Sequence, residues 1–134
     1  ETVFICEIAE ELGYKQRLFG SIIQYNNSMY LIPFEAEYMY KVDLHTRTYK
    51  QIDIVDHKNK RKGDVHYLKF LSAHICENKI YMIPVAYPAI VEFDCVTEEV
   101  AYYDGWVKFI DKYYLFDDAA FFRKSLRSNV FILV

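Results

Sequence analysis

The chain has 134 residues, of which 53% are hydrophobic and 18% aromatic, and this is enough to build the core of one domain. The net charge of −3 is too small to indicate a polyanionic partner, and no apolar run reaches membrane-spanning length. Neither nucleic acid nor a membrane is therefore expected as a partner. Three scattered cysteines without metal-type spacing predict a reducing, cytoplasmic location, with no metal and no cofactor.

The first segment, residues 1–18, has two possible structures. Residues 2–8 could form an outer strand that belongs to a preceding blade. Alternatively, residues 5–12 form a short helix that Gly13 stops.

The next segment, residues 19–69, is predicted to hold four short strands. Its apolar and β-branched stretches are residues 21–25, 29–32, 38–42 and 48–52. Asn26 and Asn27 suit a tight turn between the first two strands, and Pro33 ends the second by removing a ladder donor. Asp43 begins another turn, where its carboxylate can accept bonds from nearby backbone amides.

Residues 70–121 repeat this plan at a fixed offset of 51 residues, without a gap. The matched pairs include Ser21 and Ser72, Asn27 and Asn78, Tyr30 and Tyr81, Ile32 and Ile83, Asp43 and Asp94, and Thr46 and Thr97. The strands expected in the second copy are residues 72–76, 80–83, 89–93 and 99–103. A period of this size is typical of solenoids, propellers or arrays.

Each copy yields expectations about individual residues. The second strand of each copy should lie in the middle of its sheet, so four of its side chains are expected in the core: Tyr30, Ile32, Tyr81 and Ile83. Asp43 and Asp94 are expected to stabilise equivalent turns and not to be catalytic.

The rest of the chain is less regular. Residues 106–110 and 113–116 predict an inserted hairpin, or a loop, at the end of the second copy. Alternatively, these residues themselves open the third copy. Residues 122–134 look like the start of a third copy, because residues 128–133 echo residues 78–83 with a one-residue slip. The single domain, residues 1–134, therefore holds two copies and a piece.

Two stretches of each copy resemble kelch repeats. They are residues 29–32 with 40–46, and residues 80–83 with 91–97. The kelch family has an "iYviGG" strand, a "vyvYD…T" strand and then an aromatic residue, near which Tyr49 and Tyr102 lie. The kelch Gly-Gly pair is absent, and Pro33-Phe34 and Pro84-Val85 stand in its place. The resemblance covers residues 19–103 and implies antiparallel four-stranded blades of a β-propeller.

Two copies and a piece cannot close a ring, because propellers have four to eight blades. The expected fold class is therefore all-β, a partial β-propeller that belongs to a longer chain or completes its ring by self-association. The alternative is a two-sheet β-sandwich or layer.

Few residues suggest chemistry. Glu35 and Glu37 have the character of the paired acids of a glycoside hydrolase, but the second copy has Ala86 and Pro88 there. His74 is expected on an inner strand, where it either lines a central channel or is buried in the core with its hydrogen bonds satisfied. The basic run 57–62 lacks interleaved aromatics and is interpreted as a solvated loop.

Two functions remain open. The kelch-like resemblance implies a non-catalytic binding scaffold whose rim loops recognise a protein, peptide or glycan. The alternative is part of a carbohydrate-active β-propeller enzyme. For the scaffold, the expected ligand-binding residues combine aromatic area with hydrogen-bonding tips in the loops after the second strands and between copies: Phe34, Glu35, Glu37, His66, Tyr67 and Tyr87.

Overall fold

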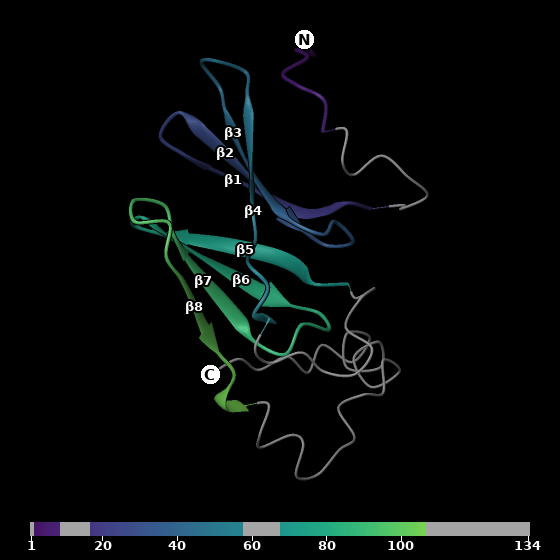
Figure 1. Cartoon of the computed structure of the whole chain (residues 1–134), viewed down its shortest axis with the longest axis vertical. Helices are drawn as coiled ribbons and strands as arrows, with labels where there is room; N and C mark the ends of the chain where they lie inside the picture. The colour runs from purple at the N-terminus through teal and green to yellow at the C-terminus, as the bar shows by residue number, and fades with distance from the viewer. Residues whose placement is uncertain (1, 9–16, 58–67, 107–134) are drawn as a thin grey trace.

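The computed structural model describes residues 2–8, 17–57 and 68–106, and it confirms the all-β class (Figure 1). Eight strands form two antiparallel sheets of four strands each. The first sheet contains β1 (Phe19–Tyr25), β2 (Ser28–Pro33), β3 (Met39–Asp43) and β4 (Tyr49–Ile52), in that order. The second sheet contains β5 (Phe70–Cys76), β6 (Lys79–Pro84), β7 (Ile90–Asp94) and β8 (Val100–Tyr103), also in order. The four-stranded sheets predicted for residues 21–52 and 72–103 are therefore confirmed.

The two copies match in backbone detail as well as in strand order. Ser21 pairs with Ile32 in the first sheet, and Ser72 pairs with Ile83 in the second, each just after a register shift in the first strand. Left-handed backbone conformations also recur at the same offset, in the turns of both sheets: Asn26 and Glu77, Arg47 and Glu98. The repeat in the sequence is therefore a repeat of backbone geometry.

Asp43 and Asp94 stabilise equivalent turns, as the sequence predicts. Asp43 Oδ1 accepts hydrogen bonds from the backbone N–H groups of His45 and Thr46, both at 2.8 Å. Asp94 Oδ1 accepts the corresponding bonds from the second-copy turn, at 2.8 and 3.0 Å. A carboxylate with two amide donors satisfies backbone groups that the tight turn leaves without ladder partners.

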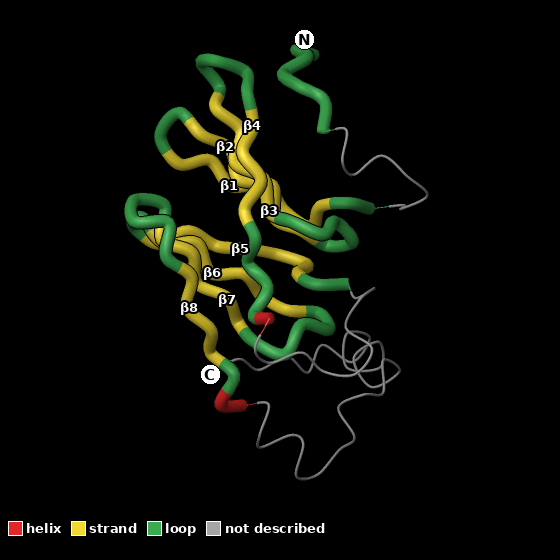
Figure 2. Tube along the Cα trace, viewed as in Figure 1, coloured by secondary structure: helices red, strands yellow, loops and turns green. Residues whose placement is uncertain are grey.

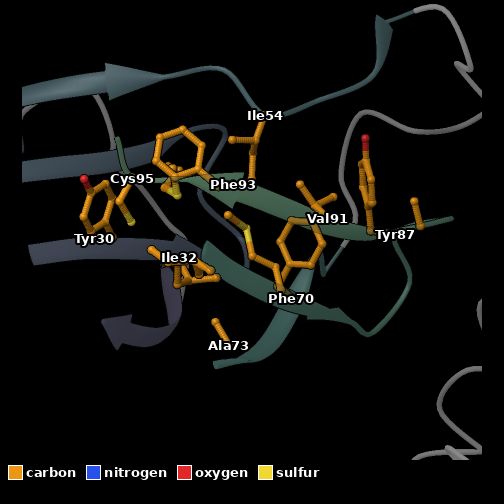
Figure 3. Packing of buried hydrophobic residues seen from close by; sticks show 13 residues of the cluster. Tyr30, Ile32, Ile54, Phe70, Ala73, Tyr87, Val91, Phe93 and Cys95 are labelled. Carbon is orange, nitrogen blue, oxygen red and sulfur yellow. The ribbon is translucent and has the colours of Figure 1, made fainter. Parts of the chain in front are cut away.

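The main core lies between the two sheets (Figure 3). Tyr30 and Ile32 are 1% and 0% exposed, and the Tyr30 ring lies 5.6 Å from the ring of Phe93 in the opposite sheet. The second sheet contributes several further buried side chains: Phe70, Ile80, Met82, Val91 and Phe93. Ile54, which follows β4, fills the same layer, and its carbonyl accepts a bond from the Tyr102 hydroxyl at 2.9 Å.

Tyr81 and Ile83 differ from the expectation for the core, because they are only partly buried. They occupy the same strand positions as Tyr30 and Ile32, but their side of the second sheet faces away from the first sheet. His74 shares that side through its pairing with Tyr81, and it is exposed rather than buried. The position of a residue within its copy therefore does not decide whether its side chain is buried. Burial also requires that a neighbouring sheet covers that side.

The outer face of the first sheet is covered by the N-terminal segment. Leu31, Tyr40 and Val42 form a second apolar cluster there, and Ile5 and Ile8 pack against it. Residues 2–8 belong to no strand, so the predicted outer strand is wrong. Residues 5–8 are not helical either, and the remainder of the alternative helix lies outside the described residues.

Three other predictions concern parts of the chain that the structure does not describe. They are the inserted hairpin after residue 106, the start of a third copy at residues 122–134, and the basic run beyond His57. Within the described ranges, no helix has the length and apolar character needed to cross a membrane.

At Gly20 the backbones of β1 and β5 approach each other closely. A Cβ atom at this position would overlap the carbonyl oxygen of Phe70 and lie 2.8 Å from that of Leu71. Both obstacles are backbone atoms of β5, and they cannot swing aside as a side chain can. The missing Cβ therefore allows β1 to lie directly against β5.

Truncation of Ile32 to Ala should lower the free energy of unfolding by about 2–5 kcal/mol, because it leaves a cavity between the sheets. The matched control is Ile22→Ala on β1, where the side chain is 60% exposed, and this change should stay within about 0.5 kcal/mol. Urea unfolding of both variants tests the pair. Equal losses would contradict the assignment of the core to the layer between the sheets.

Gly20→Ala should destabilise the protein by about 1–3 kcal/mol, because the added methyl group forces β1 away from β5. The control is Gly105→Ala, where an added Cβ meets no atom within 4 Å. Thermal unfolding should show a lower Tm for the first variant only. An unchanged Tm for Gly20→Ala would show that the sheets can separate at no cost.

Candidate functional site

The loops after β2 and β6 lie at the same end of the two sheets. Figure 2 shows them on one side of the molecule, with the tight hairpin turns on the other. The pairing of Phe19 with Pro33 and of Phe70 with Pro84 brings the starts of β1 and β5 to this end as well. We call residues 17–18, 34–38, 68–69 and 85–87 the rim surface.

Backbone hydrogen bonds join the parts of the rim surface. The N–H of Phe34 donates to the Leu18 carbonyl at 2.8 Å, and the N–H of Val85 donates to the Lys69 carbonyl at 2.8 Å. Lys69 connects the two copies, because its N–H donates to the Phe34 carbonyl at 2.7 Å and its Nζ donates to the Ala36 carbonyl at 2.8 Å. The two loops are therefore fixed relative to one another.

Arg17 organises the charged part of this surface. Its guanidinium lies 5.1 Å from the centre of the Phe34 ring, which is a cation–π distance. The same guanidinium donates to the carbonyls of Phe19 and Gly20, at 3.3 and 3.2 Å. Its backbone N–H donates to Glu35 Oε2 at 2.7 Å. Arg17, Phe34 and Glu35 thus form one connected group at the start of β1.

The sequence analysis did not identify Arg17. It lies in the segment that matches no copy, and the position 51 residues later is Leu68. One feature of the sequence points to Arg17: it is a charged residue two positions before the apolar strand β1, at the end of the sheets where the loops after β2 and β6 lie. Without a known strand boundary, that signal does not distinguish Arg17 from other charges in residues 1–18.

Glu35 and Glu37 differ in their surroundings. Glu35 is partly buried, and one of its carboxylate oxygens accepts a hydrogen bond from the backbone N–H of Arg17. Glu37 is exposed. A glycosidase requires two acids that face one another across a substrate. The Glu35 carboxylate instead accepts a hydrogen bond from the rim backbone.

Tyr87 lies in the core and does not present its ring on the rim surface. It is 9% exposed, and its ring centre lies 5.1 Å from that of Phe70. Its hydroxyl accepts a hydrogen bond from the Asp56 N–H at 2.8 Å. The aromatic ring of Tyr87 is therefore used for packing in the core, and ligand binding by this residue stays a prediction. His66 and Tyr67 lie outside the described residues.

The opposite end of the sheets carries an ion-pair cluster. Lys41 Nζ lies 3.1 Å from Glu98 Oε1, and Lys50 Nζ pairs with the other oxygen of the same carboxylate. Hydrogen bonds from Lys50 and Lys41 hold the pKa of the Glu98 carboxyl below its ordinary value. The cluster links the first sheet to the turn between β7 and β8, which is a structural role.

Cys95 has none of the properties of a nucleophile. Burial raises the pKa of its thiol, and the Tyr30 hydroxyl beside it is buried as well. A protonated, enclosed thiol reacts slowly. Within residues 2–8, 17–57 and 68–106, no group of three or more His, Cys, Asp or Glu side chains is placed to hold a metal ion.

Comparison of the chain with protein families, with curated proteins and with solved structures gives no match. Arguments about function therefore depend on the geometry of the rim surface and on the repeat.

The turn carboxylates predict how stability depends on pH. Bonds from Thr46 and His45 lower the pKa of Asp43 below 3.8, and bonds from Thr97 and Val96 lower that of Asp94 in the same way. Unfolding restores the ordinary values. Both groups therefore stabilise the fold above a pH of about 4, and this contribution is lost as the pH falls through their folded-state pKa values.

The double variant Asp43→Asn/Asp94→Asn keeps an acceptor oxygen in each turn but cannot ionise. Its Tm should be lower than that of the wild type near neutral pH, and the difference should narrow on acidification. Thermal unfolding measured over a series of acidic pH values tests this. Two parallel curves would contradict a role for ionised carboxylates in the turns.

Proposed function

We propose that the chain is a segment of a divergent kelch-like β-propeller that acts as a non-catalytic recognition scaffold. Its rim surface would bind a protein or peptide. Two observations support the propeller arrangement: the sheets repeat at a fixed offset, and successive sheets stack face to face with their first strands side by side. The same arrangement in further copies would build a ring, either within a longer chain or by self-association.

The observation that carries the binding proposal is the connected group of Arg17, Phe34 and Glu35 on a fixed backbone. It offers an aromatic ring, a guanidinium and carboxylates, including the exposed Glu37, within one short stretch of surface. A surface with both signs of charge suits a polypeptide, which carries charged side chains and amide groups.

A glycan is supported less well. Sugars bind through stacking on an aromatic face, and the Arg17 guanidinium lies over the ring of Phe34. The carbohydrate-active enzyme is also supported less well, because Glu35 is hydrogen-bonded to the backbone and Tyr87 is part of the core. The proposal is therefore a peptide-binding or protein-binding scaffold.

The variant Phe34→Leu/Glu37→Gln tests this proposal, because it removes the ring and one charge while nearly preserving side-chain volume. The chain would be screened against a phage-displayed random peptide library and a glycan microarray. Peptides selected by the wild type should bind the variant at least about tenfold more weakly, which corresponds to about 1.4 kcal/mol. The Tm should change little.

The control variant is Gln24→Ala/His45→Ala, which alters exposed residues at the hairpin end. It should bind the selected peptides as the wild type does. Equal loss in both variants, selection of glycans alone, or no selected peptide would each contradict the proposed rim site.

A further inference from the structure

Arg17 is an exposed arginine whose guanidinium pairs with no carboxylate of the described residues. One edge of the guanidinium is used on the protein itself, because Nε donates to the Phe19 carbonyl and Nη2 donates to the Gly20 carbonyl. The Glu35 carboxylate, which lies close by, accepts its bond from the backbone N–H of Arg17 and not from the guanidinium. The positive charge of Arg17 is therefore not neutralised within the described part of the chain.

The other edge of the guanidinium is open. In this planar group, Nη1 and the outer N–H of Nη2 form a fork on the side away from Nε, and this fork donates to no described residue. Two parallel N–H groups match the two oxygens of a carboxylate, and such forked pairs are among the strong hydrogen-bonded contacts of proteins. The open edge therefore has the geometry of a carboxylate receptor.

The guanidinium is held in place before a ligand arrives. The two carbonyl groups fix one edge, and Cζ lies over the Phe34 ring at 5.1 Å from its centre. A mobile arginine loses rotamer freedom when it binds, whereas a held one has already lost it. The ring also removes water from one side of the charge, which strengthens the electrostatic contact at the open edge.

We propose that Arg17 binds a carboxylate of the partner polypeptide at the rim surface, supplied by an acidic side chain or by a free C-terminus. The inference rests on the proposed function, and it names the chemical group that the rim surface recognises. The Phe34 ring and the backbone carbonyls position the guanidinium, and the open fork makes the contact with the ligand.

A phosphate group fits this site less well than a carboxylate does. The charged residues of the rim surface are Arg17, Lys69, Glu35 and Glu37, so its positive and negative charges balance. A phosphorylated side chain carries a charge of about −2, and the neighbouring glutamates repel the additional negative charge. A carboxylate brings a single negative charge, which the Arg17 guanidinium neutralises.

Selection from two phage-displayed peptide libraries tests the proposal. One library contains Asp and Glu, the other lacks both, and both display their peptides with free C-termini. Selected peptides are then synthesised with each acidic residue changed to its amide, and separately with an amidated C-terminus. Neutralising one carboxylate of each peptide should weaken binding about tenfold to hundredfold. The position of that carboxylate distinguishes an acidic side chain from a C-terminus.

Arg17→Lys keeps the charge and the long side chain but removes the fork. It should weaken the selected peptides about tenfold, because a lysine cannot form the paired contact. It should weaken the neutralised peptides much less, because both changes remove the same contact. The matched control is Arg47→Lys, which alters an exposed arginine at the hairpin end and should bind as the wild type does. The Tm of both variants should stay close to that of the wild type.

Several outcomes would overturn the proposal. If neutralising the carboxylate costs as much in Arg17→Lys as in the wild type, the carboxylate pairs with another residue. If the peptides bind without any carboxylate but are lost in Phe34→Leu/Glu37→Gln, the rim scaffold stands and the carboxylate assignment is wrong. Tighter binding of a peptide with phosphoserine in place of the acid would assign the site to phosphate. Failure to select any peptide from either library would contradict both the proposed function and this inference.

Discussion

The stacking of one sheet on the next is the interaction on which the rest of the structure depends. The first sheet has apolar side chains on both of its faces, and each face is buried only where another layer covers it. Tyr30 and Ile32 become core residues only because the second sheet covers them. Gly20 permits this stacking by allowing the backbones of β1 and β5 to approach closely.

The stacking also positions the candidate site. Once β1 and β5 are side by side, the loops after β2 and β6 come together, and Lys69 bonds to the backbone of the first-copy loop. A side chain in one copy can then act with a loop of the other. The rim surface is therefore a product of the interface between copies, and a single copy would not form it.

Repetition explains the differences between equivalent residues. Tyr30 and Tyr81 have the same place in their strands, but one is buried in the core and the other remains partly exposed. Lys41 and Glu92 are equivalent as well, and the first pairs with the facing sheet whereas the second pairs within its own. Equivalent positions of the two copies thus have different neighbours and different partners.

The sequence by itself determined the two four-stranded sheets and the turns at Asp43 and Asp94. These depend on local patterns of apolar, turn-forming and proline residues that act over a few positions. Only the tertiary structure decided that Tyr87 is a core residue, that Arg17 belongs to the rim surface, and that residues 2–8 cover the first sheet without forming a strand. The physical reason is that the burial of a side chain depends on whether its face of the sheet packs against another layer. That packing brings together residues that are far apart in the chain.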